Sequence, residues 1–580
     1  MWAALRLRLV ILLTCAGLLL PAANAHADGG PIMPLSAIQP GMNCTGQTVV
    51  QGTTISSFTV HVVDVVQAPG EGARILIQAS GPAVDSTGIA EGFSGSPVYC
   101  PDAFGTMENA GAISEGIGQY GNDVALVTPI EEMLGEPVDP PSSAPRLAVR
   151  PRPLLAPLTV GGLSPSVFGV LQRAAARSGR VLLADPAPTG TAAGFPVQAL
   201  VPGASVGASY SSGAITLGAV GTVTYVNGQT VYAFGHELDG AGRRALLLQD
   251  AYVYYVVNNP DPTVAPSYKL ALPGHTLGIV SSDTPNAVIG QVGSPPPSVP
   301  VDVTAHDLDT GTTVALNSLV ADETDVGLPL GASQVDSVAP LEVAQAATQI
   351  YDGPPAAESG RMCVRIYLRG SRVPLGFCNR YVGTGVPGDA GTMPPELANA
   401  ASADVATAFS VLEQVDFTAL HVRRVSADID AQRGLAEASI VGARAPRHVH
   451  AGHVVRVRLR VRVFRGRLRT FTFPLRIPAH ARGPLSVTIH GPAAPAQPSP
   501  GSQSLADALA SALSSSPSDG SAPSGLTISS IPELRAIIAA IPPYDGLYAN
   551  LPRHIKRPVY RNRALLITGR TALSFVVAPR

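Results

Sequence analysis

The chain has few charged residues and very little lysine. Asp, Glu, Lys and Arg make up only 14% of its 580 residues, and the formal net charge is −2. Lysine occurs only at Lys269 and Lys556, whereas arginine is abundant. Because proteins that bind phosphate backbones usually carry a basic surplus, this balance predicts no nucleic acid partner.

Long uncharged apolar runs are also missing beyond the first residues. Arg6 and Arg8 precede an apolar run over 9–20, and small residues follow at 23–27. A basic start, a short apolar segment and Ala-x-Ala-like sites are typical of a signal peptide, and the run is short for a membrane span. We therefore expect residues 1–27 to be a signal peptide, a secreted or cell-envelope location and no stable transmembrane anchor. An uncleaved N-terminal anchor is the alternative.

Cysteine is scarce. Cys15 lies in the expected signal peptide, which leaves Cys44, Cys100, Cys363 and Cys378. An even number in an exported chain predicts two disulfides, although four cysteines allow three connectivities. Cys363 and Cys378 bracket two strand-like runs, so they are expected to bridge a hairpin, and Cys44 and Cys100 then pair by elimination. Metal binding is the weaker alternative because there is no Cys-x-x-Cys and no histidine cluster beside them.

Glycine and proline are abundant, with 59 and 54 residues, and short β-branched runs lie between them. Residues 58–66 and 73–77 predict two strands joined at a glycine turn. Residues 164–178 predict a helix with one apolar face. The pattern indicates a mainly β chain whose length allows three or four domains.

One short stretch carries the strongest chemical signal, Gly92-Phe93-Ser94-Gly95-Ser96-Pro97. A nucleophilic serine in a tight turn needs glycine neighbours, because they allow unusual backbone angles and close approach of a substrate. In chymotrypsin-type proteases this arrangement also points the N–H groups of the serine and of the glycine two before it at the oxyanion. Ser94 is thus a candidate nucleophile, with Gly92 and Ser94 as the oxyanion hole. The alternative is an ordinary Gly/Ser turn.

A second stretch supplies a candidate base. Residues 218–226 predict a strand, Asn227-Gly228 a hairpin turn, and 231–234 a returning strand that ends at Gly235-His236. A histidine at a strand end is well placed for general base catalysis, and a turn histidine is the alternative. His61 lies in the middle of a predicted strand, where a structural role is expected.

The run 87–98 resembles the serine motif of the SpoIVB-type sporulation peptidases, a serine-protease family of the chymotrypsin-like clan. Residues 33–42 resemble the opening of that family's domain, 111–113 and 127–134 its close, and the stretch ending at His236 its histidine motif. The resemblance implies a chymotrypsin-like double β-barrel, a protein or peptide substrate, and neither metal nor organic cofactor. The two blocks stand in exchanged order, since Ser94 precedes His236, as in a circular permutation.

The third member of a catalytic triad is the least defined. The family's aspartate lies in an Asp-Pro pair upstream of the serine, but Ser80 occupies the matching position here. Asp283, in the histidine block, is the replacement candidate. The competitors are Asp64, Asp85 and Asp250, and a Ser–His dyad is a further alternative. A catalytically inactive peptidase-like protein that binds or scaffolds in the envelope is the competing function.

We expect an accessory β-sandwich-like domain beyond the core. Residues 454–464 alternate valine or leucine with arginine and return through 468–477, which predicts a hairpin. The arginine row would bind an acidic envelope partner such as a cell-wall polymer, or protect an edge from aggregation. Ser530 and Glu533 predict a capped helix through Ile541, and 564–577 a final strand. The expected domains are as follows: 1–27 signal peptide, 28–137 serine-motif barrel half, 138–195 linker and helix, 196–303 histidine-motif barrel half, 304–490 accessory β domain, 491–525 low-complexity linker, and 526–580 C-terminal helix and strand.

Overall fold

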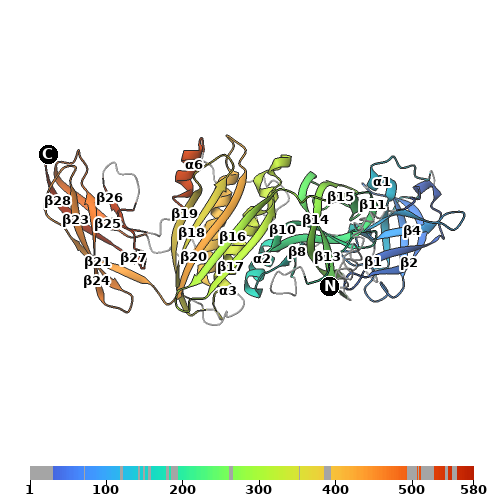
Figure 1. Ribbon diagram of the computed structural model, residues 1–580, viewed down its shortest axis with the longest axis horizontal. Coiled ribbons are helices and arrows are strands. Elements are labelled where there is room, and N and C mark those ends of the chain that lie inside the picture. The colour runs from blue at the N-terminus through green and yellow to red at the C-terminus, as the bar shows by residue number, and fades with distance from the viewer. Residues whose placement is uncertain are drawn as a thin grey trace, which may run out of the picture.

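The fold is mainly β and elongated, with three parts in a row (Figure 1). A computed structural model of the chain describes residues 30–579, apart from 71, 118–121, 142–143, 148–150, 155–157, 178–181, 185–193, 260–265, 352, 354, 385–393, 493–505, 507–508, 511–527, 542–545, 552–557 and 563. The expected signal peptide, residues 1–27, lies outside the described residues, as does most of the expected low-complexity linker over 491–525. Among the described helices, none has the length and apolar character needed to cross a membrane.

The N-terminal part is a closed barrel of six strands. Its sheet runs in the order β4-β1-β2-β3-β6-β5, and the pairing of β4 with β5 closes it, while β7 adds to β5. The strands are β1 Asn43–Val49, β2 Ile55–Ala68, β3 Gly72–Ser80, β4 Pro97–Pro101, β5 Met107–Gly116, β6 Val124–Pro129 and β7 Arg152–Pro153; the short helices η1 Leu35–Ala37 and α1 Ile130–Leu134 flank them. Inward-facing valine and isoleucine fill the barrel.

The central part is one sheet of thirteen strands, β19-β18-β20-β16-β17-β10-β13-β14-β15-β12-β11-β8-β9. An additional pairing of β10 with β11 joins β10, β13, β14, β15, β12 and β11 in a closed circuit. The strands are β8 Leu158–Gly161, β9 Leu182–Ala184, β10 Ser205–Gly213, β11 Thr216–Asn227, β12 Thr230–Ala233, β13 Gly242–Val257, β14 Tyr268–Thr284, β15 Ala287–Val292, β16 Ser298–Asp307, β17 Thr313–Ala321, β18 Ala357–Leu368, β19 Leu375–Thr384 and β20 Val422–Arg433.

Helices cover the central sheet. They are α2 Pro165–Arg177, η2 Thr324–Val326, η3 Leu330–Ser333, α3 Val335–Gln349, α4 Glu396–Glu413 and α6 Ile531–Ile538. The sequence predicted α2 and α6, and Ser530 accepts a hydrogen bond from the Glu533 N–H at the start of α6. It missed α3 and α4. Residues 335–347 of α3 are all buried, so this helix lacks the one-sided apolar pattern that marks a surface helix.

The C-terminal part, which we call the C-terminal sandwich, pairs two four-stranded sheets over one apolar core. One sheet runs β24-β23-β21-β27 and the other β22-β28-β25-β26. The strands are β21 Glu437–Arg444, β22 His448–His450, β23 Val454–Val463, β24 Leu468–Arg476, β25 Gly483–His490, β26 Tyr548–Asn550, β27 Leu566–Thr568 and β28 Arg570–Ala578. Residues 304–490, grouped together by the sequence pattern, therefore contribute to both the central sheet and this sandwich.

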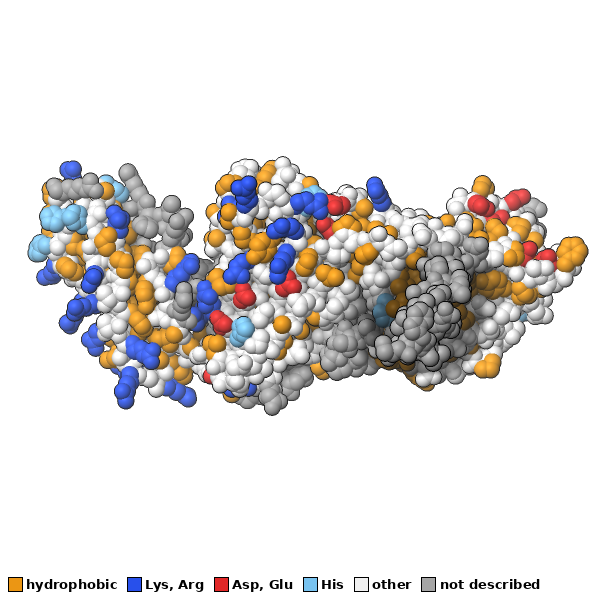
Figure 2. Space-filling view, in the orientation of Figure 1, with side chains coloured by type: hydrophobic (Ala, Val, Ile, Leu, Met, Phe, Trp, Pro, Cys, Tyr) orange, Lys and Arg blue, Asp and Glu red, His pale blue; other side chains and the backbone are white. Residues whose placement is uncertain are grey.

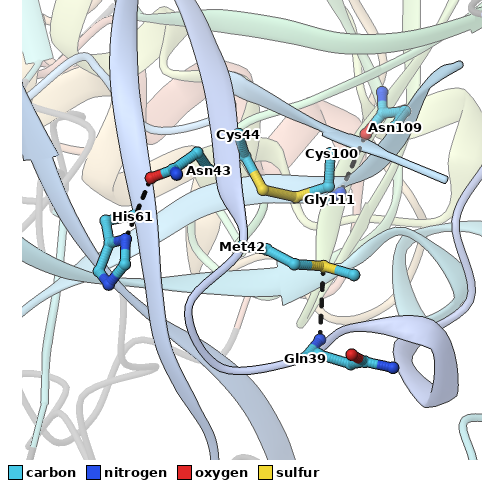
Figure 3. The surroundings of a disulfide bond; sticks show 8 residues. All are labelled: Gln39, Met42, Asn43, Cys44, His61, Cys100, Asn109 and Gly111. Atoms are coloured by element: carbon cyan, nitrogen blue, oxygen red, sulfur yellow. Dashed lines mark hydrogen bonds between the residues drawn. A yellow bond between two sulfur atoms is a disulfide. The ribbon is translucent and has the colours of Figure 1, made fainter. Parts of the chain in front are cut away.

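Both predicted disulfides are confirmed. Cys44 on β1 bonds to Cys100 on β4, with Cα atoms 4.3 Å apart, and Cys363 on β18 bonds to Cys378 on β19 across a hairpin. Figure 3 shows the first bridge, which joins the opening strand of the barrel to the strand that leaves the Ser94 turn. Two disulfides are typical of a protein outside the cytoplasm.

Candidate active site

Ser94 lies in a tight turn between β3 and β4 of the barrel. Gly92 and Gly95 adopt φ values of +87° and +90°, in the left-handed region that favours glycine. The Phe93 carbonyl accepts hydrogen bonds from the Ser96 N–H at 2.9 Å and the Ser96 hydroxyl at 2.6 Å. The Ser94 side chain is fully buried, and its Oγ forms no hydrogen bond with the described part of the chain.

The turn also presents two backbone donors. Among the described residues, neither the Gly92 nor the Ser94 N–H donates to an acceptor, whereas the Phe93 N–H bonds to the Ala90 carbonyl and the Gly95 N–H to Ile113. Buried backbone donors are nearly always satisfied. The Gly92 and Ser94 N–H groups are two exceptions within a single turn, beside the buried Ser94 hydroxyl. They are therefore well suited to donate hydrogen bonds to an anionic oxygen.

His236 follows β12, as the sequence predicts. Phe234 and Gly235 both have positive φ, of 69° and 70°, and such a conformation is strained for a buried phenylalanine. The His236 ring nitrogen Nδ1 lies 2.6 Å from the Glu237 carbonyl oxygen. Because a carbonyl can only accept, Nδ1 carries the proton, and Nε2 is then the basic nitrogen.

The two motifs meet across the boundary between the barrel and the central sheet. The Thr222 N–H on β11 donates to the Ser94 carbonyl at 2.9 Å, and the Thr224 hydroxyl donates to the Gly95 carbonyl at 2.8 Å. A Cβ atom at Gly95 would overlap the Thr222 carbonyl oxygen and crowd the backbone of Phe234, two residues before His236. Segments more than 120 residues apart in sequence are thus in backbone contact.

The His236 side is anchored in the same way. The Thr128 hydroxyl on β6 donates to the Gly235 carbonyl at 2.8 Å, and a Cβ atom at Gly235 would press on Ala112 of β5. Each motif is therefore held by strands of the other part. The turn that carries Ser94 and the strand end that carries His236 form one packed unit.

Asp283, the predicted third member, holds the loop after His236. Its carboxylate accepts from the backbone N–H groups of Leu238, Asp239 and Gly240, at 2.7, 3.0 and 2.8 Å. Burial raises the pKa of Asp283 to about 6. The structure thus brings Asp283 beside the histidine block, but gives the Nδ1 atom of the ring a backbone carbonyl as its partner.

The other predicted candidates make local contacts. Asp64 accepts from the Val65 N–H, and Asp85 from the Gly81 N–H. Asp250 bonds to the His275 ring at 3.0 Å. His61 is on an exposed face of β2, and its ring lies 3.2 Å from the Asn43 side chain (Figure 3). The contacts of these side chains thus place none of them at the Ser94 turn or on the His236 ring.

Lys269, on β14, is a residue of the site that the sequence pattern did not predict. This lysine is buried, and its Nζ donates to the hydroxyls of Thr48 at 2.7 Å and Thr222 at 3.2 Å. It also lies 4.9 Å from the centre of the Phe93 ring. The Thr222 hydroxyl in turn donates to the Gly92 carbonyl at 3.2 Å. The sequence did contain a signal that could have pointed to this residue. The chain has only two lysines, and Lys269 is the one that lies within a strand.

Burial lowers the pKa of Lys269 to about 7, because its partners are neutral hydroxyls and a ring. The unfolded chain then binds one more proton than the folded chain between pH 7 and about 10.5. We expect the free energy of unfolding to rise with pH over this range, by up to about 1.4 kcal/mol per pH unit from this lysine. Denaturant unfolding from pH 7 to 9 should show that Lys269→Met loses this slope and Lys556→Met keeps it. Equal slopes in both variants would contradict the assignment.

Comparison of the chain with protein-family models, with curated proteins and with solved structures found no match. Across the described residues, no group of three or more His, Cys, Asp or Glu side chains is arranged to hold a metal ion. The groups at the site that can take part in chemistry are Ser94, His236 and the two backbone donors.

Proposed function

We propose that the protein is an exported serine endopeptidase, similar to the SpoIVB-type peptidases, that cleaves peptide bonds at Ser94. The observation that carries the proposal is the backbone contact between the Ser94 turn and the strand end that delivers His236. A serine hydroxyl, a neutral histidine and two backbone donors are what acyl transfer needs. They meet across the boundary between the barrel and the central sheet, where each motif is held by strands of the other part.

In this mechanism the Ser94 hydroxyl attacks the carbonyl carbon of the scissile peptide and passes its proton to His236 Nε2. The carbonyl oxygen becomes an anion that the Gly92 and Ser94 N–H groups bind. The C–N bond then breaks, and His236 gives the proton to the leaving amine. Water repeats the sequence on the acyl-enzyme, with His236 again taking and returning a proton, and releases the carboxylic acid.

The orientation of His236 would depend on its loop. The Glu237 carbonyl fixes the ring tautomer, and Asp283 fixes the backbone of the next three residues. A carbonyl stabilises an imidazolium less than a carboxylate does, since it carries no full charge. We therefore propose a Ser–His dyad with Asp283 as a positioning residue, and a turnover below that of a full triad.

The topology supports a chymotrypsin-like double barrel. Six strands of the N-terminal part form a closed barrel, and six strands of the central sheet form a second closed circuit. In the proposed arrangement each contributes one catalytic group, Ser94 from the first and His236 from the second. The exchanged order of the motifs is compatible with activity because a triad depends on geometry and not on chain order.

One observation favours a second function, a peptidase-like binding protein without catalysis. The Ser94 side chain is fully buried, so a substrate reaches it only after the covering residues move. A permanently closed site would leave the fold as a scaffold. Access to Ser94 therefore separates the two functions.

A fluorophosphonate probe tests this access, because it reacts covalently with activated serine hydroxyls. The wild-type protein should be labelled stoichiometrically, and peptide mass mapping should place the label on Ser94. The Ser94→Ala variant should remain unlabelled, while Ser96→Ala should still react. Absence of labelling in folded wild-type protein would support the scaffold function.

A further inference from the structure

The C-terminal sandwich has one strongly basic face. Residues 436–491 contain eleven arginines but a single acidic residue, Glu437. Because the whole chain has a net charge of −2, the remaining residues are net acidic. In Figure 2 blue side chains are spread over this part of the molecule, at the left, and no red one is visible on it.

Four arginines stand in a row on β23. Arg456, Arg458, Arg460 and Arg462 occupy alternate positions and are exposed, while the residues between them face the core. Alternate residues of an antiparallel strand are about 6.8 Å apart. The row therefore spans about 20 Å along one face of the sheet. We call it, with its neighbours Arg444 and Arg476, the arginine face.

No carboxylate in the described part of the chain neutralises this row. Within the described residues, none of the four arginine side chains forms an ion pair or a hydrogen bond. Arg444 on β21 lies directly opposite Arg458 in the sheet register, and like charges in such a pair destabilise a sheet. The arrangement therefore costs folding stability unless an anion binds to it.

Protection of a sheet edge does not explain the row. β24 is the edge strand, whereas β23 pairs on both sides, with β21 and β24. Solubility does not explain it either. The sister sheet has an equivalent interior strand, β28, whose outward residues are Arg570 at one end, then Ala572, Ser574, Val576 and Ala578. The interior strand of one sheet thus presents a single arginine to the outside, whereas that of the other presents four in a line.

We propose that the arginine face binds a linear polymer of the polyol-phosphate type outside the cytoplasm. Arginine binds phosphate with two hydrogen bonds from its planar fork, and an extended polyol-phosphate chain repeats its charge at a similar spacing to the row. The two disulfides are consistent with a location outside the cytoplasm. This inference is independent of any activity at Ser94.

The other residues of the face argue against two other anions. The outward positions beside the row on β21 and β24 include Ser439, Thr470 and Thr472 at the centre, and Leu468 and Pro474 opposite its two ends. A single-stranded nucleic acid needs aromatic platforms on which its bases stack, and a membrane-bound face needs apolar side chains that enter the lipid. The arginine face offers hydroxyls along its centre, and its exposed apolar side chains Leu468, Pro474 and Val454 stand at its two ends. It therefore suits a polymer with a hydrophilic, base-free backbone.

The test measures binding of purified full-length protein to poly(glycerol phosphate), to vesicles containing phosphatidylglycerol and to a single-stranded DNA oligonucleotide. A variant with Arg456→Gln, Arg458→Gln, Arg460→Gln and Arg462→Gln should bind poly(glycerol phosphate) at least about 100-fold more weakly. The matched control removes four exposed arginines elsewhere, Arg243, Arg372, Arg423 and Arg570, and should stay within a few-fold of wild type.

A two-site variant, Arg458→Gln with Arg460→Gln, should show an intermediate loss of about 10-fold, and added salt should weaken binding of the wild type. Melting by circular dichroism should show that both variants fold, since the replaced side chains are exposed. Equal losses in the four-site variant and the control would overturn the proposal. Tighter binding of the wild type to vesicles or to DNA than to poly(glycerol phosphate) would also overturn it.

Discussion

Replacing His236 with glutamine is expected to slow the reaction of Ser94 with a fluorophosphonate by about 10⁴-fold or more. Glutamine keeps a polar side chain of similar reach, but its amide cannot take a proton from the serine hydroxyl. The measurement is the second-order rate constant of labelling at pH 8, with circular dichroism to confirm that the variant folds.

His275 provides the matched control. It is also a partly buried histidine of the central sheet, and its ring is paired with the Asp250 carboxylate at 3.0 Å. Because its ring is paired with a carboxylate, as in a Ser-His-Asp triad, His275 resembles a catalytic histidine more than His236, whose ring is paired with a backbone carbonyl. His275→Gln should nevertheless label at close to the wild-type rate. A larger loss in His275→Gln than in His236→Gln would transfer the role of base to His275.

Replacing Asp283 with alanine is expected to lower the free energy of unfolding by at least about 3 kcal/mol, because three backbone N–H groups lose their acceptor at a cost of about 1–3 kcal/mol each. Asp283→Asn should cost less, since an amide oxygen can still accept from the loop. Urea unfolding gives the stability, and hydrogen exchange of residues 238–240 reports the loop.

The role of Asp283 as a positioning residue makes a separate prediction. In folded Asp283→Asn the amides of 238–240 should exchange faster, and Ser94 labelling should slow together with them. Asp250→Asn is the control, because Asp250 also accepts from two backbone N–H groups, of Gln198 and His275, away from His236. It should lose stability but retain the labelling rate. Unchanged exchange and labelling in Asp283→Asn would remove Asp283 from the site.

The two halves of the candidate site could be predicted because their signals are local. The glycines around Ser94 match the positive φ values that the turn adopts, and Asn227-Gly228 closes the hairpin that leads to His236. The disulfides followed from the count of cysteines and from strand pairing. Each of these features depends on a few neighbouring residues, which a sequence displays directly.

The contacts between distant segments could not be predicted. The pattern placed Asp283 in the histidine block, but whether its carboxylate reaches a ring or a backbone depends on the path of a loop. The helix α3 was not predicted because it is buried on all sides and therefore lacks a one-sided apolar pattern. The sequence showed the alternating arginines as a row. The small net charge of the whole chain, −2, gave no indication that the residues around this row include almost no Asp or Glu.

A crystal structure of the protein after reaction with a fluorophosphonate would show whether Ser94 and His236 form one hydrolytic site. We expect a bond from Ser94 Oγ to phosphorus, with a phosphoryl oxygen within about 3 Å of the Gly92 and Ser94 backbone nitrogens. His236 Nε2 should lie within hydrogen-bond reach of the adduct. An adduct on another residue, or a phosphoryl oxygen directed away from both N–H groups, would contradict the account.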